Sequence, residues 1–209
     1  MNNVYYILLG WLLGLLGPRI IELIQRHYKK KEIRESLFVE FQDIRGKLAM
    51  NAFLAASRSD CVDRALLKWV EPSLRACKHS YEVYSLADKV KPLLDLDDSQ
   101  LHAIYAVQKG GTFGLKKYAL PFLNSQITSL HIFSAQFRQL ALGIQAEITM
   151  LNEEIDAIWF HYTKTFDSSM SQQNHAIIRK NIEKSYETIV RISHDVIDKI
   201  ERILSMESK

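Results

Sequence analysis

The sequence predicts an all-α protein with a single N-terminal transmembrane helix that continues into an elongated cytoplasmic helical bundle with a long C-terminal antiparallel helical hairpin. Apolar residues recur at spacings of three and four along most of the chain, which is the period of an amphipathic helix. The 209 residues include only eight glycines and four prolines, too few for the frequent turns of an all-β fold. The excess of positive charge lies beside one apolar segment near the N-terminus, which is typical of a membrane anchor.

Residues 1–28 are predicted to be the transmembrane anchor. Residues 4–17 carry no charge, and four aliphatic residues between positions 20 and 24 continue the apolar character. A helix needs about 20 residues to cross the hydrocarbon core, so the span has to include Arg19 and Glu22. These two residues are three apart and can pair on one helix face, and the Arg19 side chain can also extend toward the inner interface.

Tyrosines and basic residues mark the expected membrane interfaces. Tyrosine favours the headgroup level, and about 22 helical residues, or roughly 33 Å, separate the tyrosines at the two ends. Lysine and arginine beside a span remain in the cytoplasm, so we expect the N-terminus outside the cell membrane and the C-terminal domain in the cytoplasm. The predicted interface residues are Tyr5, Tyr6, Tyr28, Arg26, Lys29, Lys30, Lys31 and Arg34.

Three glycines lie within the predicted span. Gly10 and Gly14 are four residues apart, on one face of the helix, and Gly17 adds a small residue one turn later. Two helix backbones can approach closely at such a face, which favours self-association in the membrane. A core helix of a soluble protein and a cleaved signal peptide are the alternatives to a span, although a signal peptide carries its positive charge before the apolar run.

The charge distribution divides the chain into two parts. Residues 1–34 contain six Lys or Arg and two Glu, whereas the other 175 residues contain 21 basic and 22 acidic residues. The globular part therefore has no general attraction for nucleic acid, which is not an expected partner. The expected partners are the lipid bilayer and either a second copy of the chain or another protein.

Residues 29–209 are predicted to form one cytoplasmic helical domain with three parts. These are a juxtamembrane helix at 29–58 that continues the anchor, short helices at 59–110 and a long antiparallel hairpin at 111–209. Among the short helices, Ser59 or Asp60 is expected as an N-cap, and Pro72 is expected in the first turn of the following helix.

Two apolar stripes of helical period predict the hairpin, and a polar loop at 168–171 joins them. Pro121 is expected to kink the start of the first helix. The first stripe is Leu123, Ile127, Leu130, Phe137, Leu140, Ile144, Ile148, Leu151, Ile155, Ile158 and Tyr162. The second stripe is Ile178, Ile182, Tyr186, Ile189, Ile192, Val196, Ile200 and Ile203. The second stripe has a near-heptad spacing, which favours coiled-coil pairing within or between chains.

The sequence contains no residue pattern for catalysis, a cofactor or a metal ion, so no such residue is predicted. The seven histidines form no His-x-x-x-His pair and no Glu-x-x-His motif. The glycine-rich stretch at 110–117 lacks the spacing of a phosphate-binding loop. Cys61 and Cys77 are expected to be free thiols.

The predicted function is that of a non-enzymatic, membrane-anchored interaction protein, such as a scaffold or sensor subunit that acts through oligomerisation or a protein partner. The main alternative is a small membrane-acting effector, such as a toxin, a pore component or a phage-exclusion factor. The charged residues Arg19 and Glu22 within the expected span favour that alternative. An enzyme with a site dispersed over the bundle is a third hypothesis.

Overall fold

The computed structural model describes residues 2–59, 61–77, 80–107 and 114–206, except for the side chains of residues 2–4, 6–9, 12, 13, 15, 106 and 107. These residues form helices and connecting segments and no strand, which confirms the predicted all-α bundle. The elements are α1 (Asn2–Ser59), α2 (Arg64–Ala76), α3 (Tyr81–Val90), η1 (Lys91–Asp95), α4 (Asp98–Val107), α5 (Pro121–Gln126), η2 (Ile127–Ile132), α6 (Ala135–Lys164) and α7 (Gln172–Ser205).

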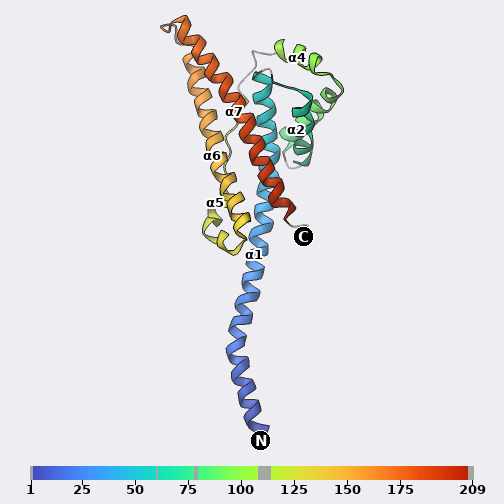
Figure 1. The fold of residues 1–209 in the computed structure, drawn as a ribbon, viewed down its shortest axis with the longest axis vertical. Helices are drawn as coiled ribbons and strands as arrows, with labels where there is room; N and C mark the ends of the chain where they lie inside the picture. Colours follow the sequence, from blue (N-terminus) through green and yellow to red (C-terminus); the bar gives the residue numbers. More distant parts are fainter. Residues whose placement is uncertain (1, 60, 78–79, 108–113, 207–209) are drawn as a thin grey trace.

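Helix α1 is the axis of the molecule (Figure 1). It is one helix of 58 residues, about 87 Å long at 1.5 Å per residue. Its N-terminal half stands clear of the other helices, whereas its second half runs through the bundle (Figure 1). The stripe that faces the core there consists of Ile33, Leu37, Phe41, Ile44 and Leu48, which are at most 5% exposed. The helix continues without a break through the boundary predicted between residues 28 and 29.

Helices α6 and α7 form an antiparallel hairpin, and α7 also packs along α1 (Figure 1). A serine begins each helix, because its hydroxyl accepts a hydrogen bond from an N–H group of the first turn. Ser134 Oγ accepts from the N–H of Phe137 at 3.2 Å, and Ser171 Oγ accepts from the N–H of Asn174 at 3.3 Å. The isoleucines of α7 from Ile189 onward are buried between the two neighbouring helices.

The hairpin is shorter than the predicted range of 111–209. Its first helix begins at Ala135, and the chain before it forms the short helices α5 and η2. Pro121 starts α5, since a proline at the first helical position loses no hydrogen bond. Glu40 of α1 then accepts hydrogen bonds from the N–H groups of Phe122 and Leu123, at 2.8 and 2.9 Å, and so ties this turn to α1. The first predicted stripe is therefore divided between three elements.

The helices α2, α3, η1 and α4 lie on the side of α1 away from α6 (Figure 1). The prediction for Pro72 is wrong, because this residue lies inside α2 with its side chain exposed. Asp63 is the N-cap of α2 and accepts a hydrogen bond from the N–H of Leu66 at 2.7 Å. Ser59 is the last residue of α1, and Asp60 lies outside the described residues. Ser80 is the N-cap of α3, and its hydroxyl accepts a hydrogen bond from the N–H of Val83.

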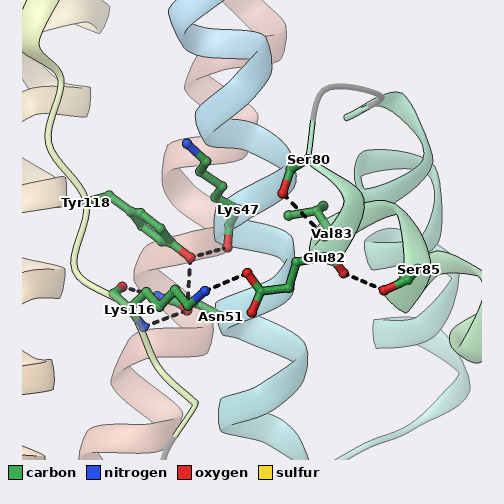
Figure 2. A network of polar contacts seen from close by, with 8 residues as sticks. All are labelled: Lys47, Asn51, Ser80, Glu82, Val83, Ser85, Lys116 and Tyr118. Carbon is green, nitrogen blue, oxygen red and sulfur yellow. Dashed lines mark hydrogen bonds and ion pairs between the residues drawn. The ribbon is translucent and has the colours of Figure 1, made fainter.

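Two asparagines hold the extended segment 114–120 between α1 and α6. Asn51 of α1 is fully buried, and its Nδ2 donates to the carbonyl oxygen of Lys116 at 2.8 Å while its Oδ1 accepts from the Lys116 N–H at 3.2 Å (Figure 2). Asn152 of α6 makes the same pair of bonds with the backbone of Tyr118, at 2.7 and 3.0 Å. The Tyr118 hydroxyl lies 3.1 Å from the carbonyl oxygen of Lys47, and burial raises its pKa. These bonds satisfy backbone groups that have no helical partner.

Candidate functional site

The described residues of the N-terminal half of α1 expose apolar side chains around the whole helix. Tyr5, Trp11, Leu16 and the aliphatic residues at 20–24 are each at least 45% exposed, and so is Tyr28. Within a folded protein, a helix that is apolar all round is normally covered by other protein or by lipid. Arg19 and Glu22 approach each other as predicted, with 3.8 Å between Arg19 Nη1 and Glu22 Oε2.

Within the described part of the chain, no helix has a stretch that is both long and apolar enough to cross a membrane. Part of the predicted anchor lies outside the described side chains. The side chains concerned are those of residues 1–4, 6–9, 12, 13 and 15, and they include the predicted interface residue Tyr6.

The three glycines of the predicted packing face are open to the surroundings. A Cβ atom built on Gly10, Gly14 or Gly17 would meet no described atom within 4 Å.

The predicted basic residues gather where α1 enters the bundle. His27, Lys30, Lys31 and Arg34 line a cavity of about 260 Å³ together with Glu35. Arg26 and Lys29 belong to the same segment but do not line this cavity. Lys30 Nζ lies 5.9 Å from the centre of the Phe133 ring, a cation–π contact that joins α1 to the start of α6. The sequence predicted the basic residues, but not Phe133, which is about a hundred positions away.

The far end of the α6–α7 hairpin is a second uncovered surface, and sequence reasoning missed it. We call residues 159–184 the hairpin end. All of these residues are described, and none of their side chains is buried. Phe166 is 71% exposed, Phe160 60% and Ile177 53%. The signal was present in the sequence, because these three apolar residues lie outside the two predicted stripes.

Aromatic contacts and positive charge characterise the hairpin end. Tyr162 packs edge-on against Phe166 at 5.2 Å between ring centres, and Lys164 Nζ lies 5.8 Å from the centre of the Phe160 ring. The charged residues of the hairpin end are Lys164, Arg179, Lys180 and Lys184 against Asp167 and Glu183. Hydrogen bonds from the Ser169 hydroxyl and N–H lower the pKa of Asp167, which stays ionised within its own turn.

No known family, curated protein or solved structure matches this chain. The two uncovered surfaces and the chemistry of the cavities are therefore the features that bear on its function.

A larger cavity of about 710 Å³ lies between α1, the end of α2 and α5, with Cys77 in its wall. Burial raises the pKa of the Cys77 thiol, and the nearby Asp43 raises it further. A thiol with a raised pKa is a poor nucleophile at neutral pH. Among the described residues, no group of three or more His, Cys, Asp or Glu side chains is arranged to hold a metal ion.

Proposed function

We propose that this protein is a membrane-anchored, non-enzymatic interaction protein, held at the cell membrane by residues 1–28 with its N-terminus outside and its bundle in the cytoplasm. The observation that carries the proposal is the pair of uncovered apolar surfaces at opposite ends of one elongated molecule (Figure 1). The segment from Tyr5 to Tyr28 is about 35 Å long as a helix, close to the thickness of a bilayer's hydrocarbon core. The cluster of bases follows directly, as the positive-inside rule requires.

The anchor would hold the hairpin end well away from the bilayer. From Tyr28 to Ser59, α1 extends roughly 45 Å at 1.5 Å per residue. The hairpin end reaches past the C-terminal end of α1 (Figure 1). A partner bound there would lie in the aqueous phase, so the second surface suits a protein better than the membrane in which the anchor sits.

The hairpin end suits an acidic amphipathic helix of another protein. Two antiparallel helices leave a groove that a third helix can fill with its apolar face. Exposed aromatic residues such as Phe160 and Phe166 are typical anchors of protein interfaces. Four bases against two acids give the surface a positive charge, so a second copy of the same surface would be repelled. An acidic partner would instead be attracted.

Photo-crosslinking in the cells that make the protein tests this partner. A benzophenone amino acid placed at Phe160 or Phe166 should give a crosslink to a different polypeptide, mapped by mass spectrometry to an acidic amphipathic segment. The same group at Leu142 serves as the control, because Leu142 is 44% exposed on the same helix but outside the hairpin end. Reversing the charge at Lys164 and Arg179 should lower the crosslink yield by roughly tenfold, since each charge pair contributes about 1 kcal/mol.

The matched charge control is the reversal of Lys68 and Arg202, which are exposed on other parts of the surface and should leave the yield unchanged. Crosslinks between two copies of this chain, crosslinks to lipid, or equal yields from Leu142 would each contradict a dedicated partner surface at the hairpin end.

The glycine face supports self-association as a separate part of the proposal. The double substitution Gly10→Ile, Gly14→Ile places bulk where two backbones could meet. We expect this variant to stay in the membrane but to lose the dimers that a bifunctional reagent traps in wild-type membranes. The control is Leu16→Ile with Leu23→Ile, which places two β-branched isoleucines of unchanged volume on the opposite face. An unchanged crosslinking pattern in the glycine variant would exclude this face as the site of association.

A further inference from the structure

The cavity at the start of the bundle collects positive charge on one side of α1. Its basic residues are His27, Lys30, Lys31 and Arg34. The spacings of three and four between them place all four on one face of the helix. Lys31 has Glu35 as a partner at 3.9 Å, whereas Lys30 and Arg34 have no ion pair with any described residue. Like charges four residues apart repel each other, so an anion bound between them would relieve that repulsion.

One of the lining bases also contacts the bundle. The residue it contacts is Phe133, which does not line the cavity but is buried at the junction of η2 and α6 and stacks on Phe137 at 4.4 Å. Its ring lies 5.9 Å from Lys30 Nζ. This contact directs the Lys30 chain toward the bundle and limits its rotamers. Lys30 therefore lies one helical turn before Arg34 in the lining of the same cavity, and the Arg34 guanidinium group can bind two oxygens of one phosphate.

We propose that this cavity binds the phosphate of an anionic glycerophospholipid headgroup. The proposal rests on the membrane anchoring proposed above. With Tyr28 at the inner interface, the segment from His27 to Arg34 rises about 10 Å along the helix axis, which is enough to cross a headgroup layer of roughly 5–8 Å. Positive charge that only sets the orientation in the membrane does not have to line a cavity, and Arg26 and Lys29 already supply such charge. The four cavity-lining bases would therefore add selection between lipids to the general attraction of the segment.

The test compares two double variants that remove the same charge from the same short segment. In Lys30→Gln with Arg34→Gln, both residues line the cavity, whereas in Arg26→Gln with Lys29→Gln neither does. The full chain is reconstituted in phosphatidylcholine vesicles that contain spin-labelled phosphatidylglycerol, and the fraction of immobilised label is measured. The same measurement with spin-labelled phosphatidylcholine shows how much immobilisation is independent of headgroup charge. Added inorganic phosphate tests whether a free anion displaces the lipid.

We expect the wild-type chain to immobilise phosphatidylglycerol in preference to phosphatidylcholine. The cavity variant should lose roughly tenfold or more of that preference, because it removes charge-assisted hydrogen bonds to one phosphate in addition to general attraction. The control variant should lose clearly less, because it removes only the general attraction, which salt screens. Millimolar inorganic phosphate should leave the wild-type preference in place, because the headgroup is held by its lipid as well as by its charge.

Four results would overturn the headgroup site. Equal losses in the two variants would show diffuse attraction by the whole basic segment. Full displacement by inorganic phosphate would assign the cavity to a free anion. No preference for phosphatidylglycerol in a chain that stays in the vesicles would remove the site but leave the anchoring intact. If the wild-type chain fails to stay in the vesicles, the anchoring is wrong and the headgroup site falls with it.

Discussion

Replacing Gly46 by alanine should lower the midpoint of thermal unfolding by roughly 4–8 °C. A Cβ at this position would lie 2.4 Å from Cys77 Cβ and 3.2 Å from the carbonyl oxygen of Ser73. Neither atom can rotate away, so α1 and α2 would have to separate. Overpacking of this kind costs about 3 kcal/mol, and the better helix propensity of alanine returns about 1 kcal/mol. A net loss of about 2 kcal/mol corresponds to the stated shift for a bundle of this size.

Gly143 is the matched control for this substitution. It also lies inside a helix, but a Cβ there would meet only the Lys199 side chain, at 3.5 Å, which is ordinary contact. Gly143→Ala should therefore raise the unfolding midpoint by roughly 2–4 °C, as measured by circular dichroism. Adding Cys77→Gly to Gly46→Ala should restore part of the lost stability. Equal effects of the two glycine substitutions would show that α1 and α2 are less closely packed than described.

Removal of residues 1–28 should move the protein from the membrane fraction to the supernatant while the bundle stays folded. The helix lost contains the exposed apolar residues from Tyr5 to Tyr28, whereas the first core residue on α1 is Ile33. The shortened chain should therefore keep its helical circular dichroism and its cooperative unfolding. Fractionation after lysis, with a high-salt wash, measures the first effect. The wash matters because the remaining bases, such as Lys30, could hold the chain on anionic lipid by charge alone.

Two outcomes would contradict the anchoring. A full-length chain found in the supernatant would show that residues 1–28 do not insert. A shortened chain that resists the salt wash would place a hydrophobic anchor elsewhere, and the hairpin end would be the first region to examine.

The helical parts of the fold were predictable because their signals lie within single helices. The buried stripe from Ile33 to Leu48 and the one that ends at Ile203 could be predicted from helical periodicity alone, because an apolar face of a helix is normally covered by another helix. Contacts between distant segments were not predictable in the same way. Nothing local to Asn51 shows that it pairs with Lys116, and nothing local to Glu40 shows that it caps α5. Those pairings depend on which surfaces meet after the helices form.

The same distinction applies to the candidate site. The charges at 26–34 were visible in the sequence, but the contact between Lys30 and Phe133 joins residues about a hundred positions apart and could not be predicted from either segment alone. The hairpin end was missed because apolar periodicity predicts that one face of a helix is buried, but it does not show how far along that face the neighbouring helices extend. The buried residues of α6 end at Ile158 and those of α7 begin at Ser185. How much of the apolar stripes of α6 and α7 is buried thus depends on the lengths of the neighbouring helices.

The packing of α7 along α1 has a consequence for the order of events during synthesis. The ribosome must add residues 60–171 between the end of α1 and the start of its main partner. At bacterial or eukaryotic elongation rates this takes roughly 5–25 s. During that interval the apolar face that includes Leu37 and Phe41 has no α7 to cover it. A nascent chain already tethered at its N-terminus would therefore need a holding chaperone at the bilayer surface until translation of α7 is complete.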